Sequence, residues 1–426
     1  MAVLPQKEQA RIGIIGGGPA GLSLARMLKE KGVNNITVFE ALPQVGGKSF
    51  TVYQGDTVVE MGTCYATFSH KITNAWMKQY KMPMAGLREQ RFDGEDFMDY
   101  IKAGYGPPLI VQVIRYLRAK YRLERALQSA TPSQATLEEA AMPIMDWLKE
   151  RNLGKIENFM HRSTTNIAYG FVNEVPTVQA LRWNDTKLIV TGLLKQLKMP
   201  RQGWAYFWKL VASELDVRLN TRITKVERGA NEVALIDDSG ETHVFDKIIC
   251  AIPVDDFMKL TVPTENEKYV ADSIIWNGYT TTLFAAENWF QDVNTESYKD
   301  SVVIGAPMGK LLSARRDGFE QDFGGHLYLS GQLSGDYTGP ELVELLRADL
   351  ASKGAELTNL IIQKMWKYHA RYKQDAIRDG LMSRLENMQG EQNTWYTGAA
   401  FSYEAVSHIV NYNATLAPRI YTDLVA

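Results

Sequence analysis

The sequence predicts an α/β fold in which a discontinuous parallel-sheet domain carries a mixed-sheet domain and a helical lid. Three observations predict this fold. An apolar strand near residue 15 runs into a glycine-rich turn and a helical pattern. Apolar strand patterns of the same kind return later in the chain, after two long insertions. The two insertions differ in the spacing of their apolar residues. A chain of 426 residues suits two or three interleaved domains. We expect the parallel-sheet domain over residues 1–80, 201–265 and 385–426, the helical lid over 81–200, and the second sheet, lining a substrate pocket, over 266–384.

The first elements are arranged as in a Rossmann-like dinucleotide-binding unit. Residues 11–15 (RIGII) form an apolar strand, residues 16–21 (GGGPAG) contain the GxGxxG pattern, and a helix is expected over residues 22–31. A second strand over residues 36–39 ends at Glu40, an acid at the spacing that the pattern requires. This complete context predicts that the segment binds a dinucleotide.

The residue types in this unit suit the chemistry of a diphosphate. Gly16 permits the tight turn, Gly18 lets the main chain approach the pyrophosphate, and Gly21 lets helix and strand pack closely. Pro19 and Ala20 begin the helix, whose unpaired N–H groups and positive dipole end face the phosphates. The acid after the second strand is expected to accept hydrogen bonds from the ribose hydroxyls of the adenosine.

The segment after Glu40 decides between nicotinamide and flavin nucleotides. Residues 41–48 (ALPQVGGK) hold a glycine pair followed by a basic residue, and residues 58–62 (VVEMG) form an apolar strand that ends in glycine. These segments resemble the extended fingerprint of the flavin amine-oxidase superfamily, which implies a glutathione-reductase-type fold and FAD. By this resemblance the expected FAD contacts here are Ala41, Gly46, Gly47, Lys48, Gly62 and Thr63. The sequence contains no second GxGxxG for a built-in NAD(P)H site.

The resemblance also places the two later parts of the FAD-binding domain. The first is a helix over 205–215 and strands over 217–219, 223–228, 232–237, 242–245 and 247–252, in which the adenine contact falls on Val226. The second is residues 393–399 (NTWYTGA) and a C-terminal helix, with Gly398 and Val406 expected at the flavin.

One position departs from the superfamily. Relatives carry an acid directly after the glycine of the last flavin strand, whereas this chain has Ala399, so a contact through that acid is not expected. No Cys or His stands at the usual tethering point, and FAD is therefore expected to be non-covalent. Cys64, near the expected flavin face, is the alternative tether.

Within the superfamily the chain is most similar to the bacterial polyenoic fatty acid isomerases, over nearly its whole length. The segments that carry this likeness are residues 46–48, 60–62, 168–171 (AYGF), 175–176 (VP), 387–390 (NMQG), 393–394 and 396–398. In such isomerases the flavin takes a hydride from the fatty acid and returns it elsewhere, so a double bond migrates without net oxidation. The resemblance makes Arg88, at the pocket entrance, the ligand of the carboxylate. The alternative is a solvated arginine, or one paired with Glu89 or Glu95.

The two insertions have different patterns. Residues 109–121 (LIVQVIRYLRAKY) have apolar residues at helical spacing, which predicts either a core-facing amphipathic helix or one that contacts a membrane surface or lipid at the substrate entrance. Strand-like segments over 279–285, 302–305 and 326–333, with a helix near 340–353, predict a sheet in the second insertion.

The sequence leaves the reaction open. Phe401 and Tyr403 are the catalytic candidates, because they follow the flavin strand and could stack on a cationic substrate carbon, with core packing as the alternative. We expect His161, His326, His369 and His408 to be structural. Three functions are compatible: isomerisation of an unsaturated lipid, oxidation of an amine or small secondary metabolite, and a flavin-binding scaffold without turnover.

Composition excludes several classes. The net charge is −2 and no Lys/Arg block occurs, so nucleic acid is not an expected partner. Two cysteines cannot form a disulfide framework, and no metal-ligand pattern is present. Without an apolar stretch of about 20 residues or a secretory signal, a transmembrane segment is not expected and a cytoplasmic location is. Oligomeric state is not encoded in any pattern here.

Overall fold

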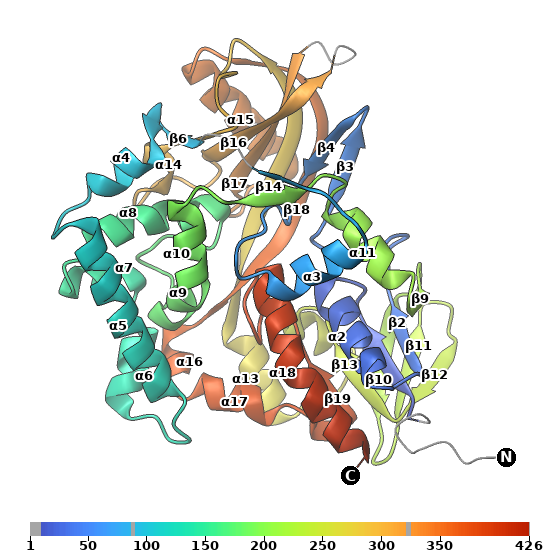
Figure 1. Ribbon diagram of the computed structural model, residues 1–426. Coiled ribbons are helices and arrows are strands. Elements are labelled where there is room, and N and C mark those ends of the chain that lie inside the picture. Colours follow the sequence, from blue (N-terminus) through green and yellow to red (C-terminus); the bar gives the residue numbers. More distant parts are fainter. Residues whose placement is uncertain (1–9, 87–89, 321–324, 426) are drawn as a thin grey trace.

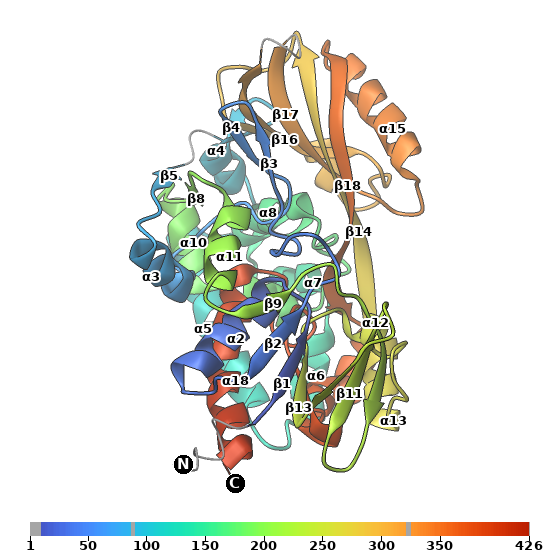
Figure 2. The same ribbon diagram turned by 90° about the vertical axis from the view of Figure 1, so that its right-hand side faces the viewer.

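The computed structural model describes residues 10–86, 90–320 and 325–425. Their two largest sheets lie in a lower and an upper domain, with a helical region on one side (Figure 1). The side view shows the long strands β14 (Ile274–Glu287) and β18 (Glu356–Tyr372) running from the upper sheet down to the lower domain (Figure 2). The lower domain is built from strands near both chain ends and from the middle of the chain.

The lower domain contains a five-stranded sheet in the order β19-β13-β1-β2-β9. Its strands are β1 (Ile12–Ile15), β2 (Ile36–Phe39), β9 (Asp216–Arg218), β13 (Lys247–Cys250) and β19 (Thr394–Tyr396), and each neighbouring pair is parallel. Most of these strands are fully buried, as expected for a parallel sheet with both faces covered. The parallel sheet therefore draws its strands from three distant parts of the chain.

Helices and a three-stranded antiparallel sheet cover the two faces of this sheet. The helix α2 (Pro19–Glu30) packs beside α18 (Val406–Val425) and α11 (Trp204–Ala212) (Figure 1). The antiparallel sheet consists of β10 (Ile223–Arg228), β11 (Val233–Asp237) and β12 (Thr242–Phe245). It lies directly on β1, because a Cβ placed on Gly13 would come within 2.7 Å of the Phe245 ring.

The upper domain is a seven-stranded mixed sheet in the order β18-β14-β17-β16-β15-β6-β7. Its further strands are β17 (Gly325–Leu333), β16 (Leu311–Glu320), β15 (Thr295–Ser297), β6 (Gln90–Phe92) and β7 (Glu95–Asp96). The helix α15 (Gly339–Ser352) packs Leu346 and Leu350 against Phe284 and Tyr328 of this sheet. The hairpin β3 (Thr51–Gln54) and β4 (Thr57–Glu60) packs on β16.

The helical region has its own buried core, in which Trp147, Leu148, Leu153 and Tyr116 are fully buried. Its helices are α4 (Phe97–Lys102), α5 (Leu109–Leu127), α6 (Gln134–Ala141), α7 (Ile144–Glu150), α8 (Gly154–Ser163), α9 (Thr177–Trp183) and α10 (Thr186–Leu193). The two ends of the region meet where β5 (Met84–Gly86) pairs with β8 (Lys198–Pro200).

Shorter elements join these parts. They are α3 (Lys71–Gln79), α12 (Val254–Phe257), α13 (Glu265–Asp272), α14 (Lys299–Val302), α16 (Gln374–Arg378), α17 (Leu381–Asn387), and the 3-10 turns Thr165–Ile167 and Glu391–Asn393.

One expectation about the insertions needs correction. Residues 302–305 were expected to form a strand, but Val302 ends the short helix α14 and a turn follows. The sequence of such a short apolar segment is compatible with a strand and with a buried helical turn alike. The first insertion is mostly helical, as expected, and its short strands β6 and β7 extend the edge of the upper sheet.

The helix expected over residues 109–121 is present and combines both predicted features. Its Tyr116 and Leu123 are buried in the core of the helical region. On the other side, Ile110 and Ile114 are 67% and 45% exposed. Core packing is thus observed for one face, and the membrane contact stays a hypothesis for the other. Within the described part of the chain, no helix combines the length and apolar character needed to cross a bilayer.

Candidate cofactor and substrate site

Glycines from three distant segments converge at the N-terminus of α2. Gly16 adopts a φ of +112°, and a Cβ on Gly21 would lie 2.0 Å from the carbonyl oxygen of Gly16, so neither position accepts a side chain. A Cβ on Gly18 would meet nothing closer than the Cα of Gly47, at 3.8 Å. Gly398, with a φ of +106°, faces Ala20 in the same way at 3.8 Å.

This arrangement fits a diphosphate. The helix starts with Pro19, and no side chain among the described residues caps its N-terminus. The first-turn N–H groups and the positive end of the helix dipole are therefore left to a ligand. Gly18, Gly47 and Gly398 therefore surround the start of the helix with main chain and no side chain of their own, and we call this arrangement the glycine cradle. The residues present thus suit the pyrophosphate of FAD.

Glu40 directly follows β2, beside the cradle, and is only 8% exposed. Its Oε2 accepts a hydrogen bond from the N–H of Gly17 at 2.8 Å, and its Oε1 accepts one from the N–H of Leu42 at 2.9 Å. The carboxylate therefore holds the glycine turn and the segment that begins with Ala41 in position. Its predicted bond to the ribose stays a prediction.

Val226, the residue predicted to meet the adenine, makes a main-chain hydrogen bond within the protein. The N–H of Val226 donates to the carbonyl of Leu260 at 2.7 Å, so this amide is already used within the protein. The segment next to Glu40 is instead residues 220–223, because the N–H of Thr221 donates to the carbonyl of Glu40. The predicted contact of the Val226 main chain with the adenine stays a prediction.

Gly46 and Lys48 lie beside the cradle and contact different parts of the protein. The N–H of Gly46 donates to the carbonyl of Gly17 at 2.9 Å, which fixes the second glycine turn against the first. The amino group of Lys48 forms a 2.7 Å ion pair with Oε1 of Glu404 and lies 5.3 Å from the centre of the Tyr368 ring. Here Lys48 binds a carboxylate of the neighbouring cavity wall, and its contact with a pyrophosphate stays a prediction.

A cavity of 390 Å³ lies next to these segments and is lined by the upper sheet, the helical region, residues 62–70 and residues 404–406. Three residues expected at the flavin, namely Gly62, Thr63 and Val406, form part of its wall. Aromatic side chains line much of the rest: Tyr65, Phe97, Tyr169, Trp183, Tyr279 and Tyr368. A cavity of this size whose exposed wall is mainly apolar is typical of a site for a small molecule with an apolar part.

Most charged groups in the wall of this cavity are paired. Lys195 lies 3.2 Å from Asp96 at its rim, and Glu404 is held by Lys48. His70 also lines the cavity, and burial lowers its pKa to about 3, so its imidazole is neutral. Arg162 lines the cavity as well, and its Nη1 is buried without a hydrogen-bond partner.

Arg315 is fixed at the floor of the cavity by several bonds. Its Nε and Nη2 donate to Asp317 at 2.6 and 2.7 Å, and Nη2 also donates to the carbonyl of Glu60. Its Nη1 lies 3.1 Å from the sulfur of Cys64. Burial nevertheless raises the pKa of the Cys64 thiol above its usual value, which keeps the sulfur protonated and poorly nucleophilic. Burial likewise raises the pKa of Glu60 to about 8.

The two catalytic candidates lie outside the wall of this cavity. Tyr403 stacks on Trp183 with ring centres 5.8 Å apart and packs edge-on against Tyr169, so it supports two aromatic wall residues from behind. Phe401 stacks on Tyr396 and lines a separate pocket. Both positions show the core packing that was the alternative for these residues.

The remaining predicted site residues are placed as follows. Arg88 lies outside the described residues. His161 shares a 2.7 Å hydrogen bond with Tyr100, and His408 one of 2.9 Å with the carbonyl of Arg182. His369 is buried, and burial lowers its pKa to about 3.

Arg162 and Tyr65 are cavity residues that sequence reasoning missed. Tyr169, by contrast, lies in a segment that carried the resemblance. Arg162 has no motif around it, and its importance depends on what surrounds it in the folded chain.

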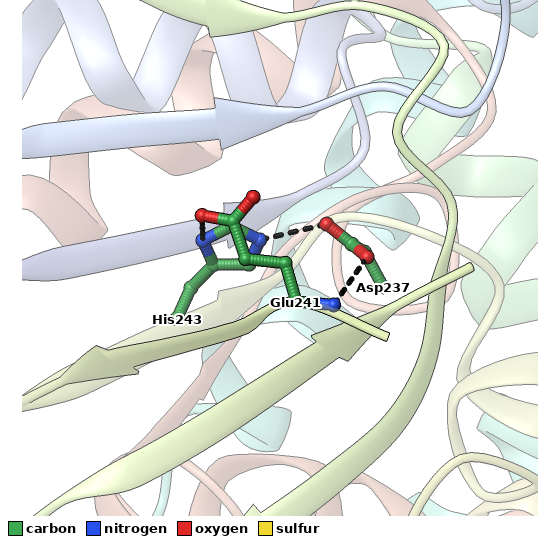
Figure 3. Close-up of side chains that lie close together, drawn as sticks. All are labelled: Asp237, Glu241 and His243. Carbon is green, nitrogen blue, oxygen red and sulfur yellow. Dashed lines mark hydrogen bonds and ion pairs between the residues drawn. The ribbon is translucent and has the colours of Figure 1, made fainter. Parts of the chain in front are cut away.

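A group of ligand-type side chains lies on the three-stranded sheet (Figure 3). Asp237, Glu241 and His243 are the described residues close enough together to suit a metal ion. Their atoms are already engaged, since Asp237 accepts from the O–H of Ser239 at 2.6 Å and bonds His243 at 2.8 Å. These bonds hold the pKa of Asp237 well below its usual range. The guanidinium of Arg218 lies 3.2 Å from His243 and opposes a cation there, so we assign the group a structural role.

Comparison with known proteins gives a consistent set of relatives. The family model of the flavin-containing amine oxidoreductases matches residues 19–355. The polyenoic fatty acid isomerase of Ptilota filicina is 21% identical over 469 aligned residues, which cover 93% of this chain and 92% of that protein. The probable polyamine oxidase 4 of Arabidopsis thaliana is 24% identical over 268 residues, or 59% of this chain, and the match spans 52% of that protein.

Solved structures give the same fold. The CLA-producing fatty acid isomerase from P. acnes superimposes with a TM-score of 0.82 at 19% sequence identity, covering 98% of this chain and 99% of that one. At this identity the likeness establishes the fold, an FAD-binding domain joined to a mixed-sheet domain.

Proposed function

Because the chain belongs to the flavin-containing amine oxidoreductase family, we propose that it is an FAD-dependent enzyme that moves a double bond in an unsaturated fatty acid. Bound FAD would supply the acceptor and donor of a hydride. The protein's own residues would bind the substrate, orient its reacting carbon and exclude water. We further propose that FAD is held non-covalently, since the Cys64 thiol is engaged by Arg315 and has a raised pKa.

The observation that carries the proposal is the 390 Å³ cavity. Its wall includes the expected flavin-side residues Gly62, Thr63 and Val406, so a molecule in it would lie against the cofactor. Aromatic faces such as those of Tyr169 and Tyr368 exclude water and can stabilise a carbon that becomes positively charged when it loses a hydride. An isomerisation needs such an environment and no outside electron acceptor.

Two further points support a fatty acid. The relative that matches over 93% of this chain and 92% of its own length is named a fatty acid isomerase, whereas the chain spans 52% and 50% of two plant polyamine oxidases. The charges of the described cavity wall also sum to an excess of one cation, because Lys195, Arg315 and Glu404 have partners and Arg162 has none. A positive wall favours an anionic substrate over a cationic one.

The test is an anaerobic titration of the yellow holoprotein with linoleate and then with amines. We expect a conjugated-diene absorbance with linoleate, without lasting loss of flavin colour and without oxygen uptake on exposure to air. Lasting bleaching by linoleate or failure to produce a diene would refute isomerisation of that class of substrate.

Oxidation of an amine is the second candidate, and one observation favours it. Oε2 of Glu404 is buried without a hydrogen-bond partner, and Glu404 lines the cavity beside Ala405 and Val406. A free carboxylate oxygen among aromatic rings could accept a hydrogen bond from an amine. Bleaching by amines, followed by peroxide formation in air, would establish this function. Silence with both substrate classes would favour a flavin-binding scaffold.

A further inference from the structure

Arg162 occupies an unusual place in the cavity wall. It lies in the last turn of α8, and its guanidinium stands 4.8 Å from the centre of the Phe97 ring, which also lines the cavity. The Nη1 atom is buried and makes no hydrogen bond. In the described part of the chain, no carboxylate lies within ion-pair distance of this side chain.

Two other charged groups of the same wall form ion pairs. Arg315 forms a two-pronged pair with Asp317, at 2.6 and 2.7 Å. Lys195 lies 3.2 Å from Asp96. Burial lowers the pKa of Arg162 to about 10, which still leaves the side chain charged at neutral pH. Arg162 is therefore a cation in the wall that the surrounding described residues leave without a counter-charge.

A contact with an aromatic face does not replace a counter-ion. A buried charge is normally paired or hydrogen-bonded, because removing it from water is costly. A guanidinium offers two parallel N–H groups, and the group that matches them is a carboxylate. The cavity in front of Arg162 is the space in which such a group can lie.

We propose that Arg162 binds the carboxylate of the substrate inside the cavity. This inference rests on the proposed function only in taking the cavity as the substrate site, and it names the substrate class as carboxylic acids with an apolar chain. The apolar chain would then lie along the aromatic wall towards Gly62 and Val406.

Asn166 supplies a second group in the same wall. Its Oδ1 is buried without a partner, and its Nδ2 donates to Oγ of Ser297 at 3.0 Å. The oxygen and nitrogen of an amide are interchangeable in such a network. With the amide turned, Oδ1 would accept from the Ser297 hydroxyl and Nδ2 would donate to the second oxygen of a bound carboxylate.

The experiment separates binding from turnover by using ligands that cannot isomerise. Decanoate, 1-decanol and decylamine are titrated by calorimetry into the FAD-loaded protein and its Arg162→Gln and Arg162→Lys variants. Arg201→Gln, at an exposed arginine outside the cavity, is the matched control, and Arg88→Gln tests the rival anchor.

We expect decanoate to bind the wild type at least tenfold more tightly than decanol. Arg162→Gln should weaken decanoate binding by about 10- to 100-fold and leave decanol unchanged, as expected for loss of a charge-assisted pair. Arg162→Lys should retain part of the preference, while Arg201→Gln should bind like the wild type.

Folding is checked by FAD content and melting temperature. Arg162→Gln removes a charge without a counter-ion, so its melting temperature should equal or exceed that of the wild type. A marked fall would mean that Arg162 has a structural partner and would overturn the proposal. Unchanged decanoate binding in Arg162→Gln, or loss of the acid preference in Arg88→Gln alone, would overturn it too. If Arg162→Gln loses decanoate binding while linoleate forms no diene, the anchor stands and the proposed isomerisation fails.

Discussion

Gly18→Ala is the sharpest test of the cofactor cradle, because it should separate FAD binding from folding. Gly18 has a φ of −81°, which alanine adopts readily, and the nearest atom to the added Cβ is the Cα of Gly47 at 3.8 Å. The methyl group therefore fits without a clash. It would occupy the space between two glycine turns, where we expect the diphosphate to approach the main chain.

The magnitude follows from the hydrogen bonds that would be lengthened. A hydrogen bond to a charged group contributes about 1.5–3 kcal/mol. Loss of one such bond raises the Kd for FAD by about 10- to 100-fold, since about 1.4 kcal/mol corresponds to a factor of ten. The free energy of unfolding of the apoprotein should change by less than about 1 kcal/mol, because an unstrained Gly→Ala replacement has a small effect.

The assay is a fluorescence titration of apoprotein with FAD, paired with a urea denaturation curve. Gly86→Ala is the matched control, since a Cβ there meets nothing within 4 Å. Gly21→Ala, whose Cβ would lie 2.0 Å from a carbonyl oxygen, should instead damage the fold itself. Wild-type FAD affinity in a normally folded Gly18→Ala protein would refute the cradle.

Four further changes test other parts of the structure. Glu40→Gln should raise the Kd for FAD by about tenfold or more in an FAD titration. The amide offers one hydrogen-bond acceptor fewer than the carboxylate, so a bond to the glycine turn or the expected bond to the ribose is lost. Asp317→Asn should lower the free energy of unfolding by about 3–5 kcal/mol by leaving Arg315 buried and unpaired, measured in urea. Because burial raises the pKa of Glu60 from 4.5 to about 8, the folded protein binds more protons than the unfolded chain between these values, and stability should fall as pH rises through this range. Replacing Ile110 and Ile114 by serine should reduce any binding to anionic lipid vesicles, measured by co-sedimentation.

Matched controls accompany these changes. Asp56→Asn, at an exposed acid, should bind FAD normally, and Glu60→Gln should remove the part of the pH dependence that Glu60 contributes. Val262→Ser, at a side chain that is 87% exposed, controls for general loss of apolar surface in the vesicle assay. A flat stability between pH 5 and 8 in the wild type, normal stability of Asp317→Asn, or vesicle binding that survives both serine replacements would contradict the respective argument.

Sequence reasoning succeeded where structure depends on local pattern. The strands over residues 36–39, 223–228 and 242–245 form with the predicted bounds, since each is an apolar segment closed by turn residues. It failed where pairing partners are distant. Residues 90–92 form a strand by pairing in parallel with residues 295–297, and nothing within such a short segment indicates that partner.

The same division holds for the site. The glycine turns could be predicted, Gly16 from the GxGxxG pattern and Gly398 from the resemblance, and both adopt the positive φ angles that glycine favours. The partners of Lys48 and Val226 could not, because Glu404 and Leu260 reach them only through the tertiary fold. A side chain that a motif assigns to a ligand can thus be held by the protein itself.

Arg88 and Arg162 are two candidates for the carboxylate anchor, the first chosen by sequence likeness and the second by packing. Sequence likeness selects an arginine by its position along the chain, and it selected Arg88. In the folded protein, an arginine available to a ligand is identified by the lack of a counter-charge around it. No sequence pattern shows this, because the spatial neighbours of an arginine are known only from the structure. Arg315 and Arg162 line one cavity, yet Arg315 is neutralised by Asp317, and among the arginines that the structure describes in this wall only Arg162 lacks a counter-charge. If a fatty acid enters this cavity, the folded chain therefore directs its carboxylate to Arg162, and the position of its double bonds relative to the flavin follows from that contact.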